Sequence, residues 1–164
     1  MKNIIIILAI ATALPTIASP PLSMRAKILL NIKSDRISIF VNSIWNEAER
    51  VQQEYGVPMA VVIGQACLES GYGYSRLARE DCNFFGTKLD HEYCRYKNKA
   101  ESFSHYGRTM TQRCYKNINP YTLSDWYESL KCCGYAGDSE ASDRYVKKLN
   151  NIIFKLNLDL IHYN

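Results

Sequence analysis

The sequence of 164 residues contains no hydrophobic run long enough to form a comfortable membrane span. Its most apolar stretch, residues 4–14, is too short for a helix to cross about 30 Å of hydrocarbon. Lys2 precedes this stretch and the small residues at 16–19 follow it, a pattern typical of a signal peptide. We therefore interpret residues 1–19 as a signal peptide and expect a secreted or periplasmic protein that is not inserted in a membrane after cleavage. An uncleaved membrane anchor is the alternative.

The sequence also lacks the residue spacings that bind metal ions. No two of the six cysteines form a C-x-x-C pair, and the three histidines (His91, His105 and His162) are scattered. Zinc sites require clustered Cys and His ligands, so we predict neither a metal nor an organic cofactor. The net charge is +4, but Lys and Arg are spread along the chain, which does not indicate a nucleic-acid partner.

An even number of cysteines in an exported protein suggests disulfide bonds. If a hairpin turn is centred near residue 88, Cys82 and Cys94 lie opposite each other and can form a bridge. Cys114 is a candidate to pair with Cys132 or Cys133. Cys67 lies within an apolar segment and is expected to be a buried free thiol.

The periodicity of apolar residues predicts a mainly α (α+β) fold in a single domain. We expect helices at about 36–55, 59–68, 75–79, 100–113, 122–133 and 141–157, and a hairpin formed by strands 83–88 and 92–96. The sequence has no internal repeat or low-complexity stretch. Residues 20–35 are predicted to be an N-terminal linker, 36–157 the folded domain and 158–164 a C-terminal tail.

Glu69 stands out in this arrangement because it ends a helix that is apolar on nearly every side. Burying a carboxylate raises its pKa, and a carboxylic acid that is protonated near neutral pH can donate to a departing oxygen. Glycosidic bond hydrolysis needs such a donor. The alternative is a solvated Glu just beyond a helix end.

Four motifs resemble, in order, those of the glucosaminidase family of peptidoglycan hydrolases, glycoside hydrolase family 73. They are Gln-Ala-Cys-Leu-Glu-Ser-Gly-Tyr-Gly (65–73), Asn-Phe-Phe-Gly-Thr-Lys (83–88), the aromatic segment 93–106, and Gly-Tyr-Ala (134–136) followed by the helix at 145–153. Together they span about residues 36–157.

This resemblance implies a lysozyme-like fold with a small hairpin lobe, and hydrolysis of the β-1,4 bond after N-acetylglucosamine in peptidoglycan strands. It implies that Glu69 is the catalytic acid and that Tyr135 lies near the cleaved sugar. The implied substrate-binding residues are Tyr72 (a Trp in the family), Phe85, Asn83 and Tyr96. We expect a monomer.

Two departures from the family pattern bear on function. Cys82 replaces the first of two asparagines, and the hairpin that carries a second acidic residue in many members is short. The candidates for this second acid are Asp90, Glu92 and Glu101, of which we choose Glu92. The N-acetyl group of the substrate, oriented by Tyr135, is the alternative.

Other hypotheses for the whole protein are a lytic transglycosylase or muramidase on the same scaffold, and a wall-glycan-binding protein without turnover.

Overall fold

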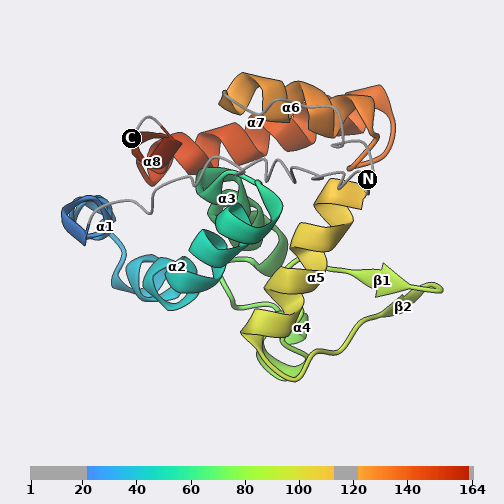
Figure 1. Ribbon diagram of the computed structural model, residues 1–164, viewed down its shortest axis with the longest axis horizontal. Helices are drawn as coiled ribbons and strands as arrows, with labels where there is room; N and C mark the ends of the chain where they lie inside the picture. Colours follow the sequence, from blue (N-terminus) through green and yellow to red (C-terminus); the bar gives the residue numbers. More distant parts are fainter. Residues whose placement is uncertain (1–21, 113–121, 163–164) are drawn as a thin grey trace, which may run out of the picture.

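The computed structural model describes residues 22–112 and 122–162, which form a mainly helical fold with one hairpin (Figure 1). The predicted fold class is thus confirmed, and the predicted signal peptide lies outside the described residues. Within the described ranges, no helix is long and apolar enough to cross a membrane. The elements are α1 (Leu22–Asn31), α2 (Asp35–Tyr55), α3 (Met59–Ser70), α4 (Arg76–Glu80), β1 (Lys88–Leu89), β2 (Glu92–Tyr93), α5 (Lys99–Gln112), α6 (Leu123–Cys132), α7 (Ser139–Lys155) and α8 (Asp159–His162).

Helix α3 forms the centre of the fold, because its apolar side chains cover nearly its whole circumference. All residues from Met59 to Cys67 are buried, with α2, α7 and α8 packed around them (Figure 1). The start of α3 is fixed by a hydrogen bond of 2.7 Å from the backbone N–H of Met59 to the side-chain carbonyl of the buried Gln52 on α2. This packing holds the last turn of α3 in a defined position.

Helix α5 approaches α2 closely where Gly107 meets the ring of Tyr55. A methyl group at Gly107 would overlap this ring, which is held by a hydrogen bond of 2.7 Å between its hydroxyl and Ser104. We therefore expect Gly107→Ala to lower the free energy of unfolding by about 1–3 kcal/mol, as overpacking does. Urea denaturation measures the change. A gain of about 1 kcal/mol, as for Ala replacing Gly in an unobstructed helix, would contradict this packing.

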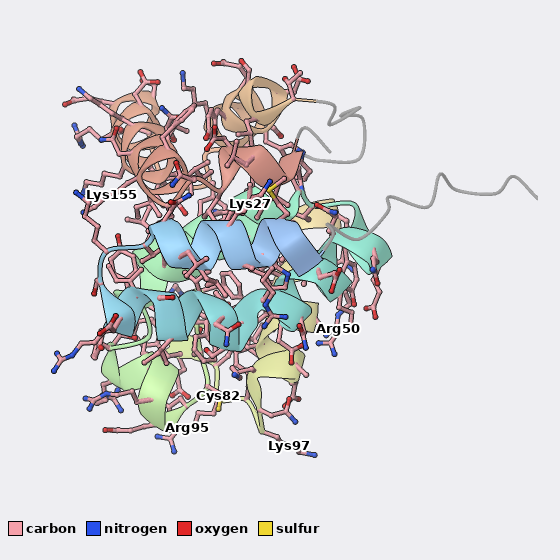
Figure 2. All side chains as sticks on the ribbon, turned by 90° about the vertical axis from the view of Figure 1, so that its left-hand side faces the viewer. Lys27, Arg50, Cys82, Arg95, Lys97 and Lys155 are labelled. Atoms are coloured by element: carbon pink, nitrogen blue, oxygen red, sulfur yellow. The ribbon has the colours of Figure 1, made fainter. Side chains whose placement is uncertain are left out.

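The predicted linker at 20–35 and tail at 158–164 need correction, because both contain helices that bury apolar side chains. Ile28 of α1 is fully buried, and Arg25 binds the side chains of Asn42 and Asn46 on α2. Figure 2 shows α1 beside α2 on one face of the molecule. Leu158 and Ile161 are buried where α8 packs against α3. The folded unit therefore extends beyond 36–157 at both ends.

The hairpin is present, but its register differs from the expected one. Lys88 pairs with Tyr93 and Leu89 with Glu92, which centres the turn on Asp90 and His91 instead of residue 88. These two turn residues have φ values of 49° and 71°, and positive φ at both positions is what a two-residue type I′ turn requires. The strands are consequently shorter than predicted, and the hairpin projects beyond α5 (Figure 1).

The predicted bridge between Cys82 and Cys94 is wrong, because this register places Cys94 opposite Thr87. The backbone N–H of Cys94 donates to the carbonyl of Thr87 at 2.9 Å, and both cysteines are free thiols. Cys82 has a φ of 50°, in the left-handed region where Asn is enriched, which gives a backbone reason for the asparagine of the family pattern. Cys67 is a buried free thiol, as predicted.

The other predicted disulfide cannot be compared with the structure, because Cys114 lies outside the described residues. Of its two candidate partners, Cys132 is an exposed free thiol at the end of α6. The thiol of Cys133 donates to the carbonyl of Leu130 at 3.6 Å. The pairing of Cys114 stays a prediction.

Candidate active site

Glu69 lies in the last turn of α3, half-buried, where the helix stops abruptly. Gly71, Tyr72 and Gly73 all have positive φ values of 56°, 58° and 82°. This left-handed path suits glycine, and the buried Ser70 stabilises it by accepting a hydrogen bond of 2.8 Å from the N–H of Gly73. The chain therefore turns away directly after Glu69 and leaves its carboxyl group at the surface of the core.

Glu69 borders a cavity of about 440 Å³ that lies between α3, α5, the hairpin and α7. The other lining residues are Phe85, Gly86, Thr87, Lys88, Tyr106, Thr109, Met110, Tyr135, Ala136 and Tyr145. A second hollow of about 320 Å³ shares Glu69, Ala136 and Tyr145 with the first, and adds Leu68, Ala141, Arg144 and Lys148. Because the two hollows share these three residues, they adjoin and together form a groove in which Glu69 lies where the two parts meet.

Aromatic rings form much of the wall of the larger hollow. The ring of Phe85 stacks on Tyr106 with centroids 3.9 Å apart and meets Phe103 edge-on at 4.9 Å. Tyr135 follows the positive-φ Gly134 after α6, and its ring lies 5.3 Å from that of Tyr145. Apolar ring faces with polar tips are suited to sugar rings. The structure thus brings two predicted site residues, Phe85 and Tyr135, into one groove with Glu69.

The environment of Glu69 favours its protonated form. Burial raises the pKa of the Glu69 carboxyl above its usual range, because desolvation penalises the charged form. A hydrogen bond from the Tyr145 hydroxyl opposes this rise and lowers the pKa by a smaller amount. Burial also holds the pKa of Tyr145 well above its usual value, so this hydroxyl stays neutral and able to donate.

Behind Glu69, a chain of buried polar side chains orients the Tyr145 hydroxyl. The amide of Gln65 donates to Tyr145 at 2.8 Å, and its carbonyl oxygen accepts from the Tyr106 hydroxyl at 2.5 Å. Gln65 is fully buried in the apolar helix, so it is held by these two partners. Because Tyr145 accepts from Gln65, its own proton is directed to Glu69.

Sequence reasoning missed Gln65 and Tyr145 as site residues. A signal for Gln65 was present, because it is a polar residue inside an otherwise apolar helix and lies four residues before Glu69, on the same face. Tyr145 lies in the helix that the fourth motif predicts, but nothing in its spacing indicated that it borders the groove.

Three predicted substrate-binding residues lie outside both hollows. Asn83 is buried, and its amide donates to the carbonyls of Thr87 at 2.9 Å and Cys94 at 3.0 Å, so it fixes the base of the hairpin. The hydroxyl of Tyr96 lies 2.7 Å from Nδ1 of His105. Tyr72 is partly buried against the core. These three residues therefore contact other parts of the protein and do not line the two hollows.

The candidates for a second acid are also absent from the groove lining. Glu92 is exposed on β2, Asp90 is exposed in the turn, and the carboxylate of Glu101 accepts the N–H of Lys97 at 2.8 Å. Among the residues described on either side of the 113–121 gap, Glu69 is the one carboxylate that borders the two hollows. Within the same ranges, no three His, Cys, Asp or Glu side chains gather as a metal site.

Residues 45–158 match the family model of glucosaminidases, described as mannosyl-glycoprotein endo-beta-N-acetylglucosaminidase. The chain belongs to this glucosaminidase family. The match covers most of the chain and includes Glu69, Tyr135 and Tyr145, and it identifies a glycoside hydrolase domain of family 73. No curated protein is similar enough in sequence to count as a relative.

Solved structures of low sequence identity share the glucosaminidase, lysozyme-like fold. The catalytic domain of the autolysin Auto from Listeria monocytogenes is 22% identical with a TM-score of 0.65, covering 88% of this chain and 99% of that one. The glycoside hydrolase domain of FlgJ from Salmonella typhimurium is 22% identical with a TM-score of 0.62, covering 74% and 89%. A peptidoglycan hydrolase from Sphingomonas sp. A1 is 21% identical with a TM-score of 0.54, covering 73% and 92%.

Proposed function

We propose that the protein is an exported peptidoglycan hydrolase that cleaves the β-1,4 bond after N-acetylglucosamine. The observation that carries this proposal is the half-buried Glu69 in the lining of both parts of the groove. Family membership and the likeness to the autolysin, FlgJ and Sphingomonas structures support peptidoglycan as the substrate. Export rests on the apolar stretch at residues 4–14.

In this proposal, Glu69 is the general acid. Its carboxyl proton passes to the glycosidic oxygen as the bond from that oxygen to C1 breaks, and the leaving sugar departs with a free hydroxyl. The raised pKa keeps a larger fraction of Glu69 protonated near neutral pH than for a solvent-exposed Glu. Tyr135 provides a ring face beside the reacting sugar, and the buried Phe85 lines the same hollow.

The groove has no second carboxylate among the described residues, so the positive charge that develops at C1 needs another partner. We propose that the carbonyl oxygen of the substrate's own N-acetyl group bonds to C1, with Tyr135 orienting that group. Water then attacks C1 and gives a proton to the Glu69 carboxylate, which restores both the acid and the N-acetyl group. The anomeric configuration is retained.

A single carboxylate also favours two rival activities on the same scaffold, those of a lytic transglycosylase and a muramidase. Mass spectrometry of cell wall digested with purified protein distinguishes these two activities from the proposed one. New reducing ends on N-acetylglucosamine are the expected product. Reducing muramic acid ends would indicate a muramidase, and 1,6-anhydro-muramic ends would indicate a transglycosylase. Either of these results would overturn the proposed bond specificity.

A further inference from the structure

The two hollows that meet at Glu69 differ in chemical character. The larger one is lined by four aromatic side chains and one cation, Lys88, whose ammonium lies 4.4 Å from the centre of the Tyr93 ring, whereas the smaller one is bordered by two cations, Arg144 and Lys148. The remaining lining of the smaller hollow is Leu68, Ala136, Ala141, Tyr145 and Glu69 itself. A groove with one aromatic arm and one cationic arm is suited to a ligand whose two halves also differ in charge.

Arg144 and Lys148 are placed for ligand binding because they lie one helical turn apart on the face of α7 that borders the hollow. The small side chains of Ala136 and Ala141 leave space between them and Glu69. Lys148 has no ion pair with any residue in the described ranges. Arg144 pairs with Glu140, but both side chains are more than half exposed, and such pairs are weak. Both cations are therefore available to an anionic ligand.

We propose that this cationic arm, defined by Arg144 and Lys148, binds a carboxylate of the muramoyl sugar of peptidoglycan. This inference rests on the proposed function and adds the direction of the strand. Peptidoglycan alternates a neutral N-acetylglucosamine with a muramic acid that carries a lactyl group and an acidic peptide. The neutral sugar occupies the aromatic arm, and the acid-bearing sugar on the leaving side of the bond occupies the cationic arm.

Binding to three glycans of equal length tests this assignment in the Glu69→Gln background, which prevents turnover. The first glycan carries peptide stems, the second has lost them to an amidase and keeps only lactyl carboxylates, and the third is a chitooligosaccharide without carboxylates. We expect Arg144→Gln with Lys148→Gln to weaken calorimetric binding of the first glycan about tenfold and to leave the third unchanged. A similar loss for the second glycan shows that the arm also binds the lactyl carboxylate, which is free only when the stem has been removed, and no loss assigns the acidic groups of the peptide.

Two further variants test whether the effect is specific to Arg144 and Lys148. Lys147→Gln removes one positive charge from the same helix at an exposed position outside both hollows, and is expected to bind all three glycans as the parent does. Glu140→Gln removes the carboxylate that competes for Arg144, and is expected to tighten binding of the stem-bearing glycan about twofold.

Equal weakening for the chitooligosaccharide, or no weakening for either carboxylate-bearing glycan, would overturn the cationic arm. These readouts do not depend on turnover. If the protein releases no wall fragments but shows the charge-dependent binding, the proposed function fails and the cationic arm stands. If the protein releases N-acetylglucosamine ends and the substitutions at Arg144 and Lys148 leave glycan binding unchanged, only the proposal of the cationic arm fails.

Discussion

Glu69→Gln is expected to reduce release of fragments from purified cell wall by roughly 10³-fold or more, because an amide has no proton to give the leaving oxygen. The structure favours this residue over other acids, since Glu69 combines burial, a raised pKa and a place in the groove. Glu92→Gln is the matched control. It removes the same charge from the exposed β2 strand, outside both hollows, and should leave the rate near that of the wild type.

Loss of activity in Glu69→Gln has to be separated from loss of the fold. The pKa of Glu69 is raised in the folded state, so the stability of the wild type falls as the pH rises through the carboxyl's titration range. Above that range Gln avoids the cost of the buried charge, and we expect the variant to unfold at the same or a higher urea concentration. Retained wall hydrolysis in a folded variant would refute the role of Glu69. A wild type that binds glycan and releases nothing would indicate a binding protein.

Tyr145→Phe is expected to move the alkaline limb of the pH profile of kcat/KM to higher pH. The Tyr145 hydroxyl stabilises the Glu69 carboxylate and lowers its pKa, so removing it raises that pKa further and keeps the acid protonated at higher pH. Activity that needs protonated Glu69 is lost as the pH rises through this pKa, which the limb reports. Below the limb, we expect kcat to fall about tenfold, because one hydrogen bond that positions the carboxyl group is gone.

The control for Tyr145→Phe is Tyr96→Phe, since Tyr96 is also a hydrogen-bonded tyrosine but lies outside both hollows. This control should leave the alkaline limb in place even if it lowers stability. An alkaline limb that stays fixed or moves to lower pH in Tyr145→Phe would contradict the proposed interaction with Glu69.

The helices around the site were predictable because their sequence patterns are long and consistent. In α2, apolar residues from Phe40 to Val51 recur every three or four positions, and Gly56 ends the helix with a φ of 71°. Helix α3 is apolar on nearly every side, which correctly indicated its central position. The acid at its end was predictable for the same reason, since a carboxylate beside so much buried apolar surface is conspicuous.

Features that depend on partners distant in sequence were not predictable. The hairpin register depends on Asp90 and His91 adopting positive φ without any glycine, so the turn was expected in the wrong place and the Cys82–Cys94 bridge with it. Helix α1 has few buried side chains, and its position depends on contacts of Arg25 with α2. The function of Gln65 becomes visible only when α5 and α7 bring two tyrosines to its amide.

The burial of α3 affects how this protein can change through mutation. The helix that fills the core also carries Glu69 and Gln65, so a substitution that shifts α3 displaces the acid and its hydrogen-bonded support together. Variants at buried positions such as Val62 or Ile63 should therefore lose turnover before they lose solubility. Adaptation to new conditions has more freedom on the outer faces of α1 and α2, where Leu30 and Ile39 are exposed and distant in sequence from the groove residues.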